Sequence, residues 1–153
     1  MRLCWTLTTL LAIALVGTLW LFLVRGAVAP ASDGRTAILL EPAERDLVLA
    51  EMRAFLQATQ AVLVSATNGD LAGAAAAARG VGAAAQHEVP ASLIGKLPLG
   101  FKQLGFDTHD RFDRIALDAD GLGDPAQTLT ALGEVLSNCV ACHAAFRIDT
   151  PQP

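Results

Sequence analysis

The hydrophobic pattern begins with one long apolar segment. From Leu3 to Val24 the residues are uncharged and mostly apolar, with Arg2 before this segment and Arg25 after it. A membrane-spanning helix needs about 20 apolar residues, whereas the apolar core of a secretory signal has about 7–15. The length therefore favours an uncleaved membrane anchor. The cationic start is expected to stay in the cytoplasm, which predicts export of the rest of the chain.

A cleaved signal peptide is the alternative for this segment. Ala29-Pro30-Ala31 precedes Ser32 and resembles the small-x-small pattern that a signal peptidase cleaves. In either case we expect residues 1–31 to be an anchor or signal segment with a short linker, because residues 27–36 are rich in Ala, Pro, Ser, Gly and Asp. Both alternatives predict a periplasmic domain, which in the first case residues 3–24 anchor to the inner membrane.

Two helices are predicted in the next part of the chain. The first spans residues 42–67 and starts with a proline, which is favoured in the first helical turn. The positions of its expected inner face are three and four residues apart: Arg45, Leu49, Met52, Leu56, Thr59 and Leu63. The second helix, residues 71–86, is Ala-rich. Asp70 can cap its start, and Gly80 and Gly82 weaken its later half.

Two more helices are predicted after an irregular stretch. Residues 87–105 contain Pro90 and Pro98, which interrupt helices. A third helix over residues 109–119, with Thr108 as its cap, would place three side chains on its inner face: His109, Phe112 and Ala116.

The fourth helix begins after Asp124, which can cap it, with Pro125 in its first turn. Its inner face is again spaced by three and four residues: Leu129, Leu132, Leu136, Cys139, His143 and Phe146. No segment is a convincing strand. The pattern therefore predicts an all-α fold, an antiparallel four-helix bundle over residues 38–149 that follows the N-terminal transmembrane anchor or signal segment.

Composition narrows the class of function. The 153 residues carry a formal charge of −4, and no basic stripe with interleaved aromatic residues is present, which argues against nucleic-acid binding. We also expect no enzymatic activity, because the sequence has no carboxylate pair, nucleophile–base set or phosphate-binding loop. Three cysteines exclude a disulfide framework, since Cys4 lies inside the apolar segment and leaves only one pair.

That pair belongs to the strongest motif of the chain, Cys139-Val140-Ala141-Cys142-His143. C-x-x-C-H is the attachment site of c-type haem. Positions three and four apart lie on one side of a helix, so the two thiols and the imidazole can face a single flat ligand. The motif predicts a haem c bound covalently through Cys139 and Cys142, with His143 as the proximal ligand of the iron.

Three other interpretations of this motif stay open. A zinc site would need two further ligands, for which His87 and His109 are available, but structural zinc pairs usually lie in turns. A redox-active dithiol would need a βαβ context, which the sequence lacks. The third interpretation is a chance pair of core cysteines beside a core histidine.

The motif also carries a resemblance to a known family. Residues 139–147, ending His143-Ala144-Ala145-Phe146-Arg147, resemble the terminal motif C-x-x-C-H-x-x-[FY]-R of cytochrome c′ and its relatives. Residues 45–52, Arg45-Asp46-Leu47-Val48-Leu49-Ala50-Glu51-Met52, are similar to the family's opening R-x-x-x-[LM]-x-x-M. The resemblance covers residues 38–148 and implies an antiparallel four-helix bundle in the periplasm. It further implies a homodimer as a candidate assembly.

The resemblance implies roles for individual residues. His143 would be the fifth ligand of the iron, and Arg147, one helical turn further on, would lie beside the proximal face and tune the histidine. The alternative for Arg147 is a cation that offsets the dipole at the helix C-terminus. Arg45 would approach a haem propionate or remain an exposed helix residue.

The sixth position of the iron decides the function. The resemblance places Leu49 there, and leucine cannot coordinate, so the iron would be five-coordinate and able to bind nitric oxide or carbon monoxide. Met52 lies on the same helix face, about 4.5 Å further along the axis, and as a sixth ligand would make the protein a low-spin electron carrier. His109 could also ligate the iron from the third helix, whereas His87 is expected to face water.

The sequence therefore predicts a periplasmic c-type cytochrome that binds small gases, carries single electrons, or does both. The implied partners are the cytochrome c maturation machinery and a redox partner protein. An exported metal-binding module is the alternative from a different class of proteins.

Overall fold

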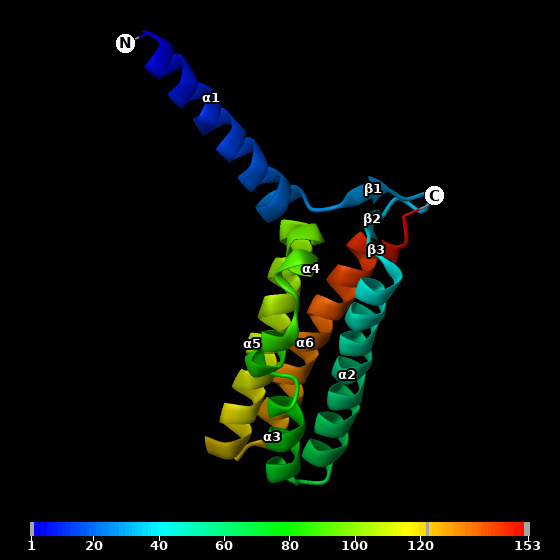
Figure 1. Ribbon diagram of the computed structural model, residues 1–153. Helices are drawn as coiled ribbons and strands as arrows, with labels where there is room; N and C mark the ends of the chain where they lie inside the picture. The colour runs from blue at the N-terminus through cyan, green and yellow to red at the C-terminus, as the bar shows by residue number, and fades with distance from the viewer. Residues whose placement is uncertain (1, 122, 152–153) are drawn as a thin grey trace.

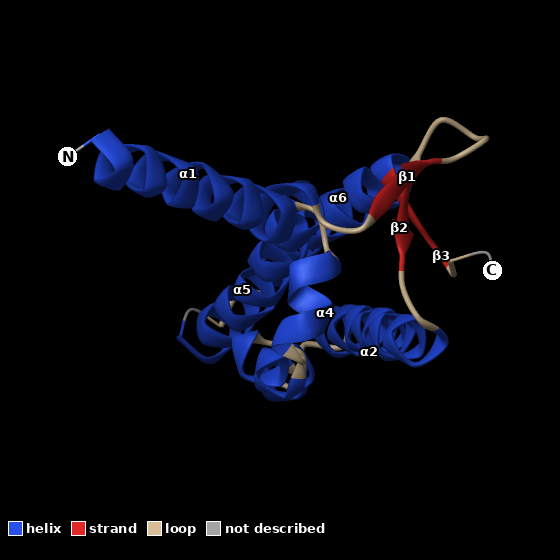
Figure 2. Cartoon of the chain, turned by 45° about the horizontal axis from the view of Figure 1, so that its top comes forward, coloured by secondary structure: helices blue, strands red, loops and turns tan. Residues whose placement is uncertain are grey.

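The structure is a computed structural model that describes residues 2–121 and 123–151, without the side chains of Leu3, His87 and Glu88. The described residues are mostly helical, with a small sheet at one end of the helical body (Figures 1 and 2). The helices are α1 (Arg2–Leu19), α2 (Pro42–Thr67), α3 (Leu71–Arg79), α4 (Ala91–Lys96), α5 (Leu99–Gly121) and α6 (Pro125–Ala145). The strands are β1 (Val28–Pro30), β2 (Thr36–Leu39) and β3 (Phe146–Asp149).

The apolar N-terminal segment is a helix that projects away from the body of the molecule (Figure 1). α1 continues into a π-helical segment, η1 (Trp20–Arg25), and the side chains of the span from Cys4 to Arg25 are almost all exposed. Its length and hydropathy are sufficient to cross a membrane. α2 is also long and apolar enough by the same measure, but it packs against α3 and α6.

Helices α2, α3, α5 and α6 pack side by side, α2 against α3 and α6, and α5 against α3 and α6 (Figure 1). Their shared core contains one aromatic ring, small alanines and β-branched residues, with the following members among others: Ala58, Val62, Ala74, Ala78, Phe112, Ile115, Leu132 and Val135. The alanines of α3 allow close approach of its neighbours. The caps predicted for α3 and α6 are present, since Asp70 accepts from the amide of Gly73 and Asp124 accepts from the amide of Ala126.

The inner face of α2 differs from the prediction by about one residue. Leu56 is 70% exposed and Leu63 is 47% exposed, whereas four neighbouring positions are buried: Val48, Ala58, Val62 and Ala66. The small side chains of this second stripe allow α2 to lie close to the Ala-rich α3, which explains why it, and not the larger leucines, faces the core.

On α6 the predicted inner face is confirmed only in part. Leu132 is buried as predicted, but the other buried positions are Thr128 and Val135, whereas Leu136 is 43% exposed and His143 is exposed. The helix also ends earlier than predicted, because Phe146 lies in β3. By contrast, the predicted inner face of the third helix is confirmed, with all three of its residues buried.

The region between the second and third helices was predicted wrongly. The second helix ends at Arg79, and a 3₁₀ segment, η2 (Ala83–Glu88), follows it. A Cβ at Gly82 would displace the carboxylate of Asp113, which accepts a hydrogen bond from the amide of Ala83 at the start of this segment. α5 begins at Leu99 rather than at residue 109, and Thr108 bonds back to the carbonyl of Leu104 inside this helix.

The three-stranded sheet was not predicted, and part of it lies in the predicted linker. β1 pairs antiparallel with β2, and β2 pairs parallel with β3 in the register Ile38↔Ile148. Ile38 and Leu40 are fully buried in a second core with Leu93 and Phe101. The sheet thus joins the end of α6 to the segment that follows the apolar helix.

Candidate functional site

A cavity of about 180 Å³ lies where the first half of α2, the end of α6 and strand β3 meet. The side chains that line it come from five elements and loops: Arg35, Arg45, Leu49, Met52, Phe101, Cys142, His143, Phe146, Arg147 and Ile148. Six of the seven candidate site residues are therefore in this cavity. The seventh, Cys139, lies one helical turn before Cys142 on α6 and is half-buried.

The last turn of α6 positions the motif. Cys142 is half-buried and His143 is exposed, so the cavity opens to solvent on the side of the imidazole. The guanidinium of Arg35 donates to the carbonyl oxygens of His143 and Phe146, both at 3.3 Å. These bonds satisfy acceptors that the end of a helix leaves free, and they attach the motif to the segment before β2.

Arg147 is not one helical turn after His143, as the sequence predicted. The chain leaves α6 at Ala145 and becomes extended, so Arg147 belongs to β3, where it is paired with Ala37 of β2. Its guanidinium contacts the carboxylate of Asp149 at 2.9 Å and that of Asp33 at 3.4 Å. The parallel pairing with β2 is the physical reason for the change, because it competes with continuation of the helix.

The arginines at the rim of the cavity differ in how fully their charges are matched. Hydrogen bonds from Arg35 lower the pKa of Asp33 to about 2, and Asp149 raises the pKa of Arg147. Arg45, in contrast, has only a loose contact with Asp46 at 3.8 Å among the described residues, and it is partly exposed. Arg45 is therefore the cation most able to pair with an anionic group in this cavity.

The two thiols of the motif are free and half-buried. Burial raises the pKa of Cys139, and burial together with the neighbouring Cys139 raises the pKa of Cys142 to about 11. Both side chains are therefore neutral thiols near neutral pH, which limits uncontrolled oxidation and alkylation.

The walls of the cavity are apolar. Leu49 and Met52 contribute from α2, and Phe101 packs edge-on against Phe146 with ring centroids 5.7 Å apart. Sequence reasoning missed Arg35 and Phe101, which it placed in the linker and in the irregular stretch, and it gave no role to Ile148 at the end of the predicted bundle. The family motif includes Phe146, but it does not indicate the strands and the loop that form the rest of the cavity.

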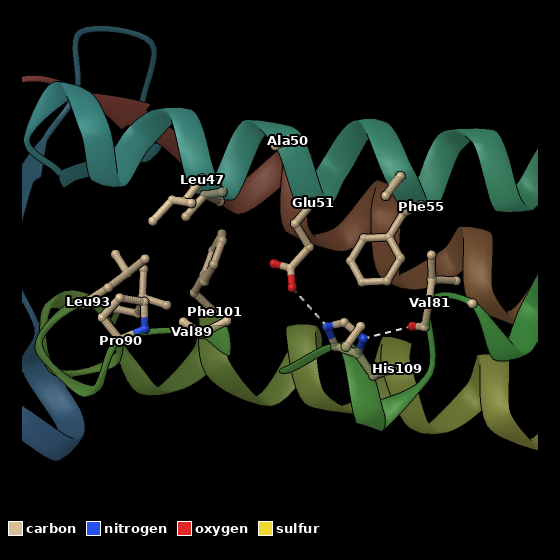
Figure 3. Close-up of a pocket in the computed structure, with 15 residues that line it drawn as sticks. Leu47, Ala50, Glu51, Phe55, Val81, Val89, Pro90, Leu93, Phe101 and His109 are labelled. Carbon is tan, nitrogen blue, oxygen red and sulfur yellow. Dashed lines mark hydrogen bonds and ion pairs between the residues drawn. The ribbon is translucent and has the colours of Figure 1, made fainter. Parts of the chain in front are cut away.

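A second cavity, of about 300 Å³, lies between α2, α4, α5 and η2 (Figure 3). It holds His109, which is only 3% exposed. One ring nitrogen, Nδ1, is 2.8 Å from the carbonyl oxygen of Val81, and the other, Nε2, is 3.2 Å from Oε1 of Glu51. The structure thus places His109 in this cavity and not among the residues around Cys142.

The environment of His109 favours its charged form. Burial by itself lowers the pKa of the imidazole, but the hydrogen bond to Glu51 and those to the carbonyls of Val81 and Gly82 outweigh burial and raise the pKa. The ring also packs against Phe55, with centroids 4.7 Å apart. Both nitrogens therefore have partners already.

A metal cluster of the zinc type is not present among the described residues, where no three His, Cys, Asp or Glu side chains could hold one ion. The side chain of His87, the other ligand considered for zinc, lies outside the described part of the structure.

Comparison of the chain with models of protein families, with curated proteins and with solved structures finds no match. The functional conclusion therefore depends on the motif and on the geometry of the two cavities.

Proposed function

We propose that this chain is a membrane-anchored c-type cytochrome of the periplasm, in which Cys139 and Cys142 hold one haem and His143 binds its iron. The observation that carries this proposal is the composition of the first cavity. This cavity is lined by Leu49 and Met52 of α2 and by Cys142 and His143 of α6. These residues were selected from the sequence, where they are about 100 positions apart.

The donor set of the cavity fits a haem. Two thiols at i and i+3 followed by an imidazole at i+4 are the groups that form the thioether bonds and the axial bond of haem c. Apolar contacts from Leu49, Met52 and Phe101 suit a porphyrin, and the exposed His143 suits a cofactor that is held covalently and only partly enclosed. When bound, the haem supplies an iron that exchanges one electron and can take a small sixth ligand.

Other residues of the chain orient the cofactor. Arg45, with its loosely matched charge, is the proposed partner of a propionate. Arg35 holds the carbonyl of His143 and so fixes the end of α6 that presents the imidazole. Arg147 contributes less positive charge to the proximal side than the family motif implies, because Asp149 and Asp33 match its charge.

The side chains above the sixth position favour a five-coordinate iron. Leu49 has no atom that can coordinate, and it lines the cavity on α2. We therefore propose binding of small gases, with single-electron transfer, as the leading function. Met52 lines the same cavity, and this observation favours a low-spin electron carrier as the second candidate. His109 is a weaker candidate for the sixth ligand, because both its nitrogens are hydrogen-bonded.

We further propose that α2, α3, α5 and α6 correspond to the four antiparallel helices of a cytochrome c′-like bundle. Their order and mutual packing support this assignment, since each runs opposite to the next along the chain (Figure 1). α4 and the sheet would then be additions to that bundle, located at the end that meets the anchor.

The contacts of the apolar helix support an uncleaved anchor. Lys102 is only 8% exposed, and its ammonium donates to the carbonyl oxygens of Phe22 and Leu23 at 3.0 and 3.2 Å. Gly26 has a positive φ of 67°, and a Cβ there would meet the backbone of Lys96. Cleavage after Ala31 would remove these contacts together with strand β1.

The spectrum of the mature protein tests the iron ligands. We would express the full chain with cytochrome c maturation factors and record ferric and ferrous absorption spectra of wild type, His143→Ala and Met52→Leu. The leading proposal expects a high-spin ferric spectrum that Met52→Leu leaves unchanged, and loss of stable holoprotein in His143→Ala. A low-spin spectrum that becomes high-spin in Met52→Leu would establish the second candidate, and an unchanged spectrum in His143→Ala would refute the assigned ligand.

A further inference from the structure

The second cavity has the features of a binding site for a membrane-borne molecule. The side chains that the structure describes around it are apolar except at one place, where Glu51 of α2 and His109 of α5 face each other (Figure 3). A volume of about 300 Å³ is at the lower end of the range for ligand pockets, which suits a single ring with part of a tail.

The carboxylate of Glu51 can accept a hydrogen bond from a molecule bound in the cavity. His109 occupies Oε1 of Glu51, and Oε2 accepts no hydrogen bond from the described residues. The Glu51 side chain is 36% exposed, so a bound molecule can reach this oxygen. Because the imidazole partner favours its cationic form, the pair is close to neutral overall. Such a pair attracts a neutral O–H donor more than a cation.

The walls favour a flat ring. Phe55 lies against His109 and stacks on Phe112 with centroids 5.7 Å apart, and Phe101 forms another part of the wall. Aromatic rings pack well against such faces in stacked or edge-on arrangements.

The opposite end of the cavity lies beside the membrane anchor. Leu93 and Leu97 line this end, and they flank the part of α4 that contacts η1. A Cβ at Gly95 would be 3.1 Å from the ring of Phe22, and the amide of Ala27 donates to the carbonyl of Lys96. Leu93 and Leu97 are buried, whereas Leu47 and Pro90 of the lining are exposed. An apolar tail leaving the cavity between Leu47 and Pro90 would therefore emerge beside α4, the helix that contacts η1.

We propose that the second cavity binds the head group of a membrane-borne hydroquinone, with a ring hydroxyl donating to Glu51 and the apolar tail leaving between Leu47 and Pro90, beside α4, toward the membrane. Phe101 lines both cavities, so this site is adjacent to the cavity around Cys142. Electron transfer between the two cavities would require the proposed haem, whereas hydroquinone binding does not depend on it.

Calorimetric titration of the full chain in detergent micelles tests the proposal. The probes are a hydroquinone with a ten-carbon tail, the corresponding quinone, and the same hydroquinone without a tail. The two hydroquinones are added to dithionite-reduced protein and the quinone to ferricyanide-oxidised protein, each after removal of excess reagent, so that no electron transfer alters the probe. We expect saturable binding of the tailed hydroquinone at one site, with weaker binding of the quinone, which cannot donate to a carboxylate. The tailless probe should also bind more weakly.

Three variants locate the site. Glu51→Gln should weaken hydroquinone binding about tenfold and abolish the preference over the quinone, because the amide can donate to a quinone carbonyl. Ala50→Trp fills the cavity from an exposed wall position and keeps the Glu51–His109 pair, so it should abolish binding without unfolding the chain. Glu134→Gln is the matched control, since this carboxylate pairs with Arg111 at 3.0 Å outside the cavity, and it should bind like wild type.

The proposal is overturned if wild type gives no saturable heat with the tailed hydroquinone, or if Glu51→Gln and Ala50→Trp bind like wild type. A haem stain of the same samples separates the two proposals. A colourless chain that binds the hydroquinone would disprove only the proposed haem, and a haem-bearing chain that does not bind it would disprove only this site.

Discussion

At the scale of single residues, the two cysteines of the motif have the same chemistry but different surroundings. Cys142 faces the cavity and has the higher pKa, about 11, whereas Cys139 lies a turn earlier. A thiol must be presented to a vinyl group to form a thioether, so the two positions should differ in accessibility before haem is attached. This difference is measurable with a small alkylating reagent.

In haem-free protein carrying Cys4→Ser, we expect iodoacetamide to modify Cys142 more slowly than Cys139 at pH 8. With a pKa of about 11, only about 1 in 1000 molecules carries the reactive thiolate of Cys142 at that pH. Peptide mass spectrometry over time gives both rates, and protein unfolded in urea is the control. Equal rates in the folded protein, as fast as those in urea, would show that the thiols are not protected by burial.

The Glu51–His109 pair predicts a pH dependence of stability. The pKa of His109 is raised above its ordinary value of 6.5 in the folded chain, so the stabilisation is complete below pH 6.5 and is lost as pH rises through the folded pKa. We expect wild type to exceed Glu51→Gln in unfolding free energy by about 1 kcal/mol more at pH 6 than at pH 9. Chemical denaturation at both pH values measures this. A constant difference between the two proteins would contradict the ion pair.

At the scale of elements, the end of the apolar N-terminal helix is attached to the body by α4 and α5. Lys102 belongs to the first turn of α5, and burial lowers its pKa, which indicates that the ammonium is held away from water by this contact. The two carbonyl groups that accept hydrogen bonds from Lys102 lie in η1, where the helical hydrogen-bond pattern ends.

Lys102→Met should lower the free energy of unfolding by about 1–3 kcal/mol, because two carbonyl oxygens of η1 lose their donor. Arg53→Met, at an exposed position of α2, is the matched control and should change stability by less than about 0.5 kcal/mol. Denaturant titration in detergent gives both values. If the two variants are equally stable, the docking of the anchor on α5 is wrong.

The elements that could be predicted are those whose ends are determined by residues in the adjacent turn. The starts of α2, α3 and α6 follow from Pro42, Asp70 and Asp124, which act on the adjacent turn. The sheet could not be predicted, because β2 and β3 are four residues long and pair across about 100 residues of sequence. The earlier start of α5 is also a tertiary effect, since Phe101 and Lys102 are buried against the sheet core and the anchor.

The candidate site divides in the same way. The motif on α6 could be read from its spacing, and Arg45, Leu49 and Met52 were chosen from the family resemblance; the structure places Cys142 and His143 of the motif and these three residues around one cavity. Arg35 and Phe101 could not be predicted as site residues, because the sheet and the early start of α5 place them at the cavity. The rotation of the core face of α2 by one residue came from the small side chains of α3, which periodicity alone does not reveal.

At the scale of the whole molecule, the sheet connects three parts that are distant in sequence. β1 follows the apolar helix, β2 precedes α2, and β3 follows the motif, so the sheet connects the apolar helix to the candidate haem site (Figure 2). We therefore expect the mature protein to keep residues 1–31. The intact mass of protein purified from membranes checks this, and a mass corresponding to a start at Ser32 would contradict it.

The most direct test of the account is whether haem is bound covalently to Cys139 and Cys142. The full chain and its Cys139→Ser/Cys142→Ser variant would be expressed with cytochrome c maturation factors, denatured, and measured by intact mass and haem stain. The account predicts one haem per wild-type chain that survives denaturation, and none on the variant. A wild-type chain with the mass of the bare polypeptide and two titratable thiols in the motif would contradict it.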